Sequence, residues 1–416
     1  MLIKKTYTNY QKTYGSIKGL CFLAYWFIHI VGEFVYALII KTFIPVNKSV
    51  IVFRSIPDYS DNARALADYM VENDYTKKYR IYFDVKDVEK FRNRDGLIKF
   101  ISTKSSFGFH KLSCLRLLLT AKYLMCTHEM IIFKRFFYRK EQSHIRLWHG
   151  CGYKDNYQKT AYPRMFDLAL VPGELFVKAK AHFWNVDEKY ILPIGYPRFD
   201  WLRCVDITAQ QLIESFKKNS NTKVVLWMPT FRVDNTGRYS QSNSITQFPI
   251  VGNEIKKWKE LDCLCIKNNI VLLVKLHPYQ KEYDIPFDIF SNISEINNQF
   301  FERVDLPQYK FIALTNALIS DYSSVAVDYL VVNRPIAFTL DDYDEYKNTR
   351  GFVFEDPRAY MPGHHLYTFN DLEQFLLDVS YDKDPYKSKR EQMYGKAICY
   401  SDNYCRSVLD TLGIIK

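Results

Sequence analysis

The stretch ALISDYSS at residues 317–324 decides the fold class, because it joins an apolar strand directly to a helix-like segment. The apolar residues predict a buried strand that ends at Asp321, and residues 323–331 predict a helix that begins at once. Small hydroxyl residues at a helix start leave backbone N–H groups that face outward, where the helix dipole favours negative charge. Ser323 and Ser324 therefore form a candidate phosphate cradle, although an ordinary serine N-cap would have the same sequence.

Three other segments also place polar residues where an apolar strand ends. They are IRLWHG at 145–150, VVLWMPTFR at 224–232 and VLLVKLHP at 271–278. In open α/β sheets, ligands bind in the crevice beyond the carboxyl ends of the strands. Four such ends carry two histidines, an arginine, a lysine and a serine pair, which indicates one site that binds phosphate.

Strands alternate with helices along most of the chain, and this alternation predicts mostly parallel sheets. The expected strands lie at residues 50–53, 80–83, 97–101, 123–126, 145–148, 168–171, 190–192, 223–227, 270–276, 317–320 and 335–339. The expected helices lie at residues 62–72, 111–119, 253–268, 307–315 and 323–331. A polar break near residues 208–222 separates two such series. We therefore predict an α/β fold of the GT-B type, in which two Rossmann-like, doubly wound domains face a cleft.

In their order along the chain, these motifs resemble the CDP-glycerol glycerophosphotransferases, the family of teichoic acid primases and polymerases. The matching motifs are YSDN at 59–62, WHG at 148–150 with Lys154, PTFR at 229–232, KLHP at 275–278, DYSSVAVD at 321–328, RP at 334–335, Asp342 with Tyr346, RGF at 350–352 and PG at 362–363. The resemblance covers about residues 50 to 380, and the order of the motifs is its specific part. Three departures concern the transferred alcohol and the acceptor more than the reaction class. Cys151 and Gly152 replace the usual Thr-Pro, Lys275 stands where arginine is frequent, and residues 325–327 are less bulky than usual.

The resemblance implies a transferase that moves glycerol phosphate, or a related polyol phosphate, from its CDP-activated donor to a hydroxyl of a growing teichoic acid or capsule polymer. CMP is released. Such a transfer requires cations and N–H donors around a diphosphate, and a base near the acceptor oxygen. Two other readings remain open at this point. One is a GT-B glycosyltransferase that uses a nucleotide sugar for a cell-surface polysaccharide, and the other is a non-catalytic polymer-binding protein, against which the intact histidines argue.

His149 is the candidate general base, and His277 is the candidate for a protonated partner of the diphosphate. Each has the alternative of a structural histidine at a strand end. The donor-binding candidates are Thr230, Arg232, Lys275, Asp321, Ser323, Ser324, Asp328, Arg350 and Gly351. The acceptor-side candidates are Ser60, Asp61, Asn62, Gly150 and Lys154.

Several of these candidates keep a structural alternative. Asp321 either bonds a ribose hydroxyl or caps its own turn, and Asp328 either braces the site or is purely structural. The YSDN motif also predicts a helix N-cap. The acidic run at residues 341–345 contains no histidine and fits a solvated turn better than a metal site. We expect no tightly bound cofactor; Mg²⁺ is compatible with the chemistry but no motif indicates it.

Residues 19–44 are apolar and long enough to span a bilayer. However, His29 and Glu33 lie near the centre of this stretch, where a carboxylate costs about 2–3 kcal/mol or more. We therefore expect a helix that lies in the membrane interface or packs on the first domain, rather than a span. Residues 131–140 combine bulky aromatics with four cations, and they predict either contact with an anionic leaflet or a solvated loop.

The net charge of +11 indicates an anionic partner, and no nucleic-acid recognition module is present. The nine cysteines form no CxxC pair and no secretory signal precedes them, so we expect a reduced, peripheral protein at the cytoplasmic face of the membrane. The expected partners are CDP-glycerol or CDP-ribitol, a lipid-linked or polysaccharide acceptor and an anionic membrane surface, with no nucleic acid.

We divide the chain into four parts. They are an apolar helix at 1–47, an acceptor-side domain at 48–207, a CDP-donor domain at 208–380 and a C-terminal helix at 381–416 that packs back on the acceptor-side domain. The Ser-, Asn-, Gln- and Gly-rich residues 234–250 lack periodicity and predict a mobile loop over the cleft.

Overall fold

The structure is a computed structural model that describes residues 16–94, 96–103, 110–128, 137–155, 166–230, 247–277, 280, 283 and 285–416. The chain forms two compact units. Unit 1 consists of Met1–Arg146, Met165–Asp167 and Lys416, and unit 2 consists of Leu147–Arg164 and Leu168–Ile415. Most of residues 147–207, expected in the acceptor-side domain, therefore group with unit 2. The assignment of an acceptor-side and a donor-side range stays a prediction.

Unit 1 is built on a parallel sheet with the strand order β3-β2-β1-β4-β5. Its strands are β1 (Asn47–Arg54), β2 (Arg80–Asp84), β3 (Ile98–Ile101), β4 (Ala121–Cys126) and β5 (Ser143–Arg146). Its helices are α2 (Ser16–Phe43), α3 (Asp61–Glu72) and α4 (Leu112–Thr120), with short 3₁₀ turns at Tyr75–Lys77 and Glu89–Phe91. The strand order reverses between β1 and β4, so the crevice at the carboxyl ends of this sheet lies there.

Unit 2 contains a second parallel sheet, with the strand order β10-β9-β8-β11-β12-β13. Its strands are β8 (Lys223–Trp227), β9 (Ile270–Val274), β10 (Ile293–Glu295), β11 (Ala317–Ser320), β12 (Ile336–Thr339) and β13 (His364–Leu366). Two short strands, β6 (Leu168–Leu170) and β7 (Ile191–Leu192), also pair in parallel. The predicted α/β fold with parallel sheets is confirmed, and the order of the second sheet reverses between β8 and β11.

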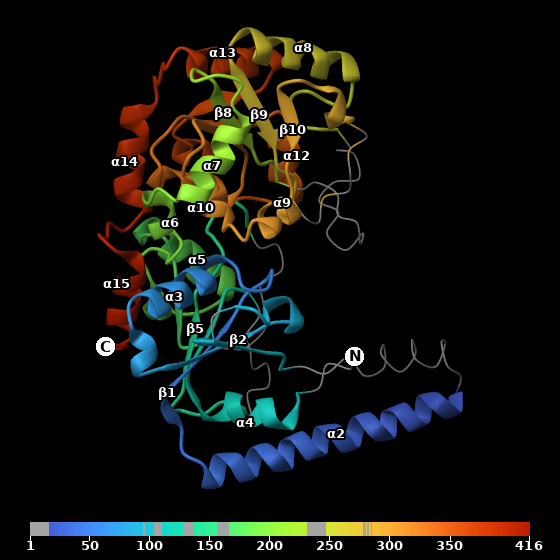
Figure 1. Cartoon of the computed structure of the whole chain (residues 1–416), viewed down its shortest axis with the longest axis vertical. Helices are drawn as coiled ribbons and strands as arrows, with labels where there is room; N and C mark the ends of the chain where they lie inside the picture. Colours follow the sequence, from blue (N-terminus) through green and yellow to red (C-terminus); the bar gives the residue numbers. More distant parts are fainter. Residues whose placement is uncertain are drawn as a thin grey trace. The chain divides into compact units, whose positions relative to one another are not determined.

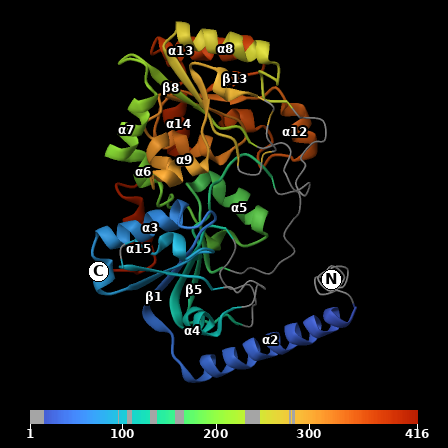
Figure 2. The ribbon, with the colours of Figure 1, turned by 45° about the vertical axis from the view of Figure 1, so that its right-hand side comes forward.

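The described helices of unit 2 each bury at least one apolar residue. They are α5 (Val177–Trp184), α6 (Phe199–Arg203), α7 (Ile207–Phe216), α8 (Ile255–Lys267), α9 (Asn298–Arg303), α10 (Gln308–Ile312), α11 (Ser324–Asp328), α12 (Tyr343–Thr349), α13 (Phe369–Ser380), α14 (Lys387–Ala397) and α15 (Tyr404–Thr411). Short 3₁₀ turns lie at Glu174–Phe176, Glu188–Tyr190, Phe287–Ile289, Tyr329–Val331 and Pro357–Tyr360. Helix α8 buries Trp258, Leu261 and Cys265, which are three or four residues apart, in the same core as β9. Helices α8 and α13 lie side by side (Figures 1 and 2).

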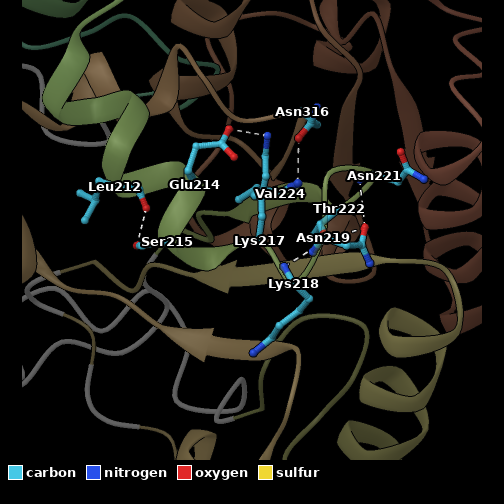
Figure 3. A network of polar contacts seen from close by, with 10 residues as sticks. All are labelled: Leu212, Glu214, Ser215, Lys217, Lys218, Asn219, Asn221, Thr222, Val224 and Asn316. Atoms are coloured by element: carbon cyan, nitrogen blue, oxygen red, sulfur yellow. Dashed lines mark hydrogen bonds and ion pairs between the residues drawn. The ribbon is translucent and has the colours of Figure 1, made fainter.

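The polar stretch that we expected as a break, residues 208–222, is instead most of a helix, α7, and a tight turn within unit 2. Thr222 closes the turn, because its hydroxyl accepts hydrogen bonds from the N–H groups of Lys218 and Asn219 at 3.1 and 3.0 Å (Figure 3). Asn316 accepts another N–H at the start of β8. The Asn and Thr side chains therefore replace backbone partners. The two series of strands do divide at this position, because β7 and β8 belong to different sheets, but most of the stretch is helical.

Helix α2 has two different faces. Its carboxylate at Glu33 is buried and accepts a hydrogen bond of 2.7 Å from the backbone N–H of His110, and Ala37 and Ile40 are buried as well. α2 lies beside α4 in both views (Figures 1 and 2). The opposite face exposes a row of large apolar side chains, namely Tyr25, Phe27, Ile28, Val31, Phe34, Val35, Leu38, Ile39 and Phe43. Of the helices that the structure describes, none combines the length and the apolarity that a membrane crossing requires.

The C-terminal residues 381–416 include two helices, α14 and α15. The backbone N–H of Cys399 donates to the carbonyl of Pro172 at 2.7 Å. Asp200 accepts both of the first N–H groups of α15, at 2.8 Å each, as a helix-capping carboxylate does. These partners belong to unit 2.

Candidate active site

The ends of β8 and β11 meet at the point where the strand order of the second sheet reverses. Thr230 follows β8 and is buried, and Asp321 follows β11 and is fully buried. The N–H and the hydroxyl of Thr230 donate to the two carboxylate oxygens of Asp321, at 2.8 and 2.5 Å. Asp321 therefore fixes the backbone turn after β8. The turn-capping alternative describes Asp321 here, and its contact with a ribose stays a prediction.

The turn that carries His149 lies against the DYSS turn. A Cβ atom added to Gly150, whose φ is +135°, would lie 2.3 Å from Oγ of Ser324. A Cβ added to Gly152 would lie 2.8 Å from the backbone N of Ser324 and 2.9 Å from the carbonyl oxygen of Tyr322. Only glycine permits this approach at both positions. Gly150, an acceptor-side candidate, therefore lies in close contact with the protein's own DYSS turn, and its contact with an acceptor stays a prediction.

Trp148, the residue before His149, has an unusual backbone geometry. Trp148 has a φ of +58°, the left-handed region that bulky residues rarely adopt. The rings of Trp148 and His149 are 4.0 Å apart, and Lys180 Nζ lies 5.1 Å from the Trp148 ring. Backbone strain of this kind clusters at functional sites, where surrounding packing maintains it. No motif in the sequence predicts this conformation.

The segment after His149 also pairs with the RGF motif. The N–H of Asp155 donates to the carbonyl of Gly351 at 3.1 Å, and the N–H of Val353 donates to the carbonyl of Tyr153 at 3.0 Å. Lys154 thus forms an isolated antiparallel bridge with Phe352. Gly351 has a φ of +78°, which glycine tolerates.

Three cationic or titratable side chains gather at the end of β9. Lys275 is only 5% exposed, and burial lowers its pKa to about 8. Burial, together with the nearby charges of Lys154 and Lys275, lowers the pKa of His277 to about 4. His277 is therefore neutral near pH 7 with these neighbours. The protonated form that we expected requires an added negative charge, such as a diphosphate, to offset the two lysines.

No carboxylate balances Lys275, because within the described residues its ammonium makes neither a hydrogen bond nor an ion pair. Nε of Arg350 is likewise buried without a hydrogen-bond partner in the described part of the chain. Burying a charge without a partner is costly, so such a group marks a place prepared for an anion. The bridge between Lys154 and Phe352 brings the RGF segment to the same region.

Sequence reasoning missed Arg198. It is fully buried, and Nη2 donates to Oδ2 of Asp328 at 2.6 Å, the same oxygen that accepts the hydroxyl of Tyr309 at 2.8 Å. The guanidinium lies 3.2 Å from a Cβ added to Gly150. Asp328 is thus paired inside the protein, and its role in bracing the site stays a prediction. Arg198 follows β7 in the run GYPR, so the strand-end signal that found the other motifs could have found it.

The structure gives less support to the predicted phosphate cradle at Ser323 and Ser324 than the sequence does. Ser323 occupies the N-cap position of α11, but its side chain makes no capping hydrogen bond. α11 is only five residues long, so its aligned dipoles are few. Phosphate binding by Ser323 and Ser324 stays a prediction.

The acceptor-side motif after β1 lies in unit 1. The hydroxyl of Ser60 donates to the carbonyl of Pro57 at 2.6 Å, so it does not cap α3. Oδ1 of Asp61 accepts the N–H of Asn62 at 2.7 Å, and Asn62 is fully buried. Tyr59 and Asp61 both have a positive φ, at 47° and 58°. The turn is therefore strained at the strand reversal of its sheet, and its role toward an acceptor stays a prediction.

Arg232 lies outside the described residues, as does the predicted loop except for residues 247–250. Across the described ranges, no group of three or more His, Cys, Asp or Glu side chains is arranged to hold a metal ion.

Known proteins share both the sequence pattern and the fold. The teichoic acid ribitol-phosphate polymerase TarL of Staphylococcus aureus is 27% identical over 350 residues, which are 79% of this chain and 56% of TarL. The teichoic acid glycerol-phosphate primase of Bacillus subtilis strain 168 is 24% identical over 363 residues, which are 81% of this chain and 86% of the primase. This chain spans about half the length of the first relatives, TarL and the polymerase TarK (49%).

The structure of the wall teichoic acid polymerase TagF superposes with a TM-score of 0.66 at 22% identity, covering 88% of this chain and 89% of that one. The expected GT-B-like fold is therefore confirmed. Residues 36–411 match the family described as CDP-Glycerol:Poly(glycerophosphate) glycerophosphotransferase, and the chain belongs to this family.

Proposed function

We propose that this chain transfers glycerol phosphate, or the related ribitol phosphate, from its CDP-activated form to a hydroxyl of a teichoic acid-like polymer. The acceptor oxygen forms a bond to the β-phosphorus of the donor. The bond from that phosphorus to the bridging oxygen breaks, and CMP leaves with the bridging oxygen. Membership in the family and the names of the relatives support this reaction class.

The single observation that carries the proposal is the buried ammonium of Lys275 beside His277 and Lys154. A diphosphate placed there supplies the negative charge that the described residues do not supply to Lys275. It also raises the pKa of His277 from its lowered value, because the anion offsets the repulsion by the two lysines. A protonated His277 then stabilises the charge that develops on the departing CMP. Arg350, whose buried Nε has no described partner, contributes a second cation.

His149 serves as the general base in this proposal. It takes the proton of the acceptor hydroxyl as the new bond to phosphorus forms. The strained Trp148 and the glycine contact with Ser324 restrict where this turn can lie, as a positioned base requires. Ser60, Asp61 and Asn62 bind the acceptor, whether it is lipid-linked or a polysaccharide.

The exposed face of α2 rests on the cytoplasmic surface of the membrane. Phe27, Ile28 and Phe43 are 65%, 68% and 77% exposed, and apolar rows of this kind mark membrane or protein contacts. The buried Glu33 on the other face explains how a carboxylate is accommodated in this helix without entering lipid. The enzyme is peripheral in this proposal.

The test measures CMP release by the full chain with CDP-glycerol, CDP-ribitol and a nucleotide sugar, each with a phosphate-terminated polyol acceptor. We expect CMP release with one of the CDP-polyols. Lys275→Met should raise KM for the donor at least tenfold, whereas His149→Ala should lower kcat by about 10²–10⁴-fold. Release of UDP from a nucleotide sugar, without CMP release from either CDP-polyol, would contradict this proposal and show that the chain is a glycosyltransferase.

A further inference from the structure

A recess of about 460 Å³ lies in unit 1 at the opposite edge of the sheet from the acceptor-side motif. It is formed by the chain that follows α2, the first residues of β1 and β2, and one side of α4. Its lining residues are Ile44, Pro45, Val46, Asn47, Val50, Arg80, Tyr82, Ser113, Arg116, Leu117 and Thr120. The parallel strands begin here and end at the other edge, where Ser60 follows β1. The recess is therefore separate from the site proposed for the acceptor.

Two arginines from different elements face this recess without a counter-ion. Arg80 opens β2 and Arg116 lies on α4, and neither guanidinium forms an ion pair or hydrogen bond within the described part of the chain. Among the residues that the structure describes, no acidic one lines the recess. Guanidinium groups match the geometry of phosphate oxygens, and two residues with hydroxyl groups, Tyr82 and Ser113, line the same recess. The polar side of the recess thus suits a phosphate group.

The other side of the recess is apolar and continues into α2. Ile44, Pro45 and Val46 follow directly on Phe43, the last residue of the exposed apolar row of α2. An occupant with a phosphate at one end and a hydrocarbon chain at the other would match both sides. A free phosphate would use only the arginines.

We propose that this recess binds the phosphate-bearing headgroup of an anionic membrane lipid, whose acyl chains lie along the apolar row of α2. The inference rests on the membrane contact of α2 proposed above and adds to it a preference for anionic lipid. Basic groups near an anionic leaflet contribute about 1 kcal/mol each. Since 1.4 kcal/mol corresponds to a tenfold change in a binding constant, two arginines predict a roughly 30-fold preference for anionic vesicles.

The test is flotation of the full chain with vesicles of phosphatidylcholine alone or mixed with phosphatidylglycerol. We expect wild-type protein to prefer the mixed vesicles, and Arg80→Gln/Arg116→Gln to lose roughly 30-fold in partition to them. The matched control is Lys86→Gln/Arg92→Gln, which removes two exposed cations that follow the carboxyl end of β2. This control should keep the preference.

A second variant separates the recess from diffuse charge attraction. Ser113→Trp keeps both arginines but fills the recess from an exposed position of α4. Loss of the preference in Ser113→Trp supports the recess, whereas wild-type behaviour shows that charge alone acts and overturns the assignment. A rise in melting temperature with inorganic phosphate that requires Arg80 and Arg116, without any vesicle preference, would assign the recess to soluble phosphate and overturn the lipid.

The membrane contact itself is tested with Leu38→Glu/Phe43→Glu on the exposed face of α2. If this variant and wild-type protein bind phosphatidylcholine vesicles equally, the α2 contact is wrong and the headgroup assignment falls with it. If Leu38→Glu/Phe43→Glu weakens vesicle binding but Arg80→Gln/Arg116→Gln and Ser113→Trp keep the wild-type preference for anionic vesicles, the α2 contact stands and only the recess assignment is overturned.

Discussion

Two buried cations of unit 2 differ in whether a carboxylate pairs with them. This difference indicates which cation can bind an anionic substrate and which one supports the fold of the site. Lys275 has no carboxylate partner in the described residues, whereas Arg198 is fully buried and paired with Asp328 at 2.6 Å. A buried pair cancels its own charge and offers little to an incoming anion. Removing one partner leaves the other charge buried and costs about 3–5 kcal/mol. We therefore assign Arg198 the role of holding the Gly150 turn in place, without contact to substrate.

This role predicts different outcomes for single and combined substitutions. Arg198→Ala should lower the urea midpoint of unfolding strongly, since Asp328 is left unpaired. The combined variant Arg198→Met/Asp328→Leu/Tyr309→Phe removes both charges and the hydroxyl that bonds Asp328, so it should recover most of the midpoint. Its kcat for CMP release should remain low because the Gly150 turn has lost its support. Full recovery of both midpoint and kcat would show that Arg198 only stabilises the fold.

Gly150 allows a matched pair of glycine substitutions. Gly150→Ala places a Cβ 2.3 Å from Ser324 Oγ at a φ of +135°, so the two turns must separate. We expect CMP release to fall at least tenfold, with the far-ultraviolet circular dichroism unchanged. Gly395→Ala is the control, because no atom of the described residues lies within 4 Å of an added Cβ in α14. This variant should be more stable by about 0.5–1 kcal/mol. Equal activity of the two variants would contradict the close approach.

At the scale of elements, β5 contains a histidine that makes the sheet of unit 1 sensitive to acid. His144 is buried and its ring stacks on Tyr138 at 3.9 Å. Burial lowers its pKa to about 4, against about 6.5 when unfolded. The unfolded chain therefore binds the proton first. The neutral His144 therefore contributes fully to the free energy of unfolding above pH 6.5. This contribution declines as the pH falls toward 4, by on the order of 3 kcal/mol in total.

His144→Phe keeps a ring on Tyr138 and cannot be protonated. Between pH 7.5 and pH 5 we expect the urea midpoint to fall less in this variant than in wild type. The control is His182→Phe, at an exposed position of α5, whose urea midpoint should fall as much as that of wild type. An unchanged pH dependence in His144→Phe would show that this histidine is not the acid-sensitive group.

The elements that were predicted well have strong local signals. β8 and β11 were predicted with their observed bounds, since long apolar runs end there in Pro or Asp. β10 and β13 were missed because each has only three residues and little apolar character. Residues 208–222 do lie between the two series of strands, but their Asn, Ser and Thr residues predict a loop, whereas most of the stretch is α7 and several of these side chains close a turn. The strand ends located most of the candidate site, but not Trp148 and Arg198, whose roles depend on tertiary packing.

At the scale of the whole molecule, the two sheets are expected to respond to different substrates. In unit 1 the YSDN motif follows β1, which borders the strand reversal, and in unit 2 the basic group follows β9, the neighbour of β8 on the side away from the reversal. Bound ligand stabilises the folded state by about 2.7 kcal/mol at 100 times its Kd, and local protection follows the element that binds. Hydrogen exchange of the full chain can therefore locate each substrate separately.

We expect CDP-glycerol to slow amide exchange at the ends of β8, β9 and β11, and Lys275→Met to abolish this protection. A short polyol-phosphate acceptor should instead slow exchange at residues 59–64, where Ser60, Asp61 and Asn62 form the strained turn after β1. Asn62→Ala should weaken only the second effect, whereas Gly395→Ala should change neither. Protection of residues 59–64 by the donor alone would reverse the assignment of the two motifs, because the nucleotide would then bind to unit 1.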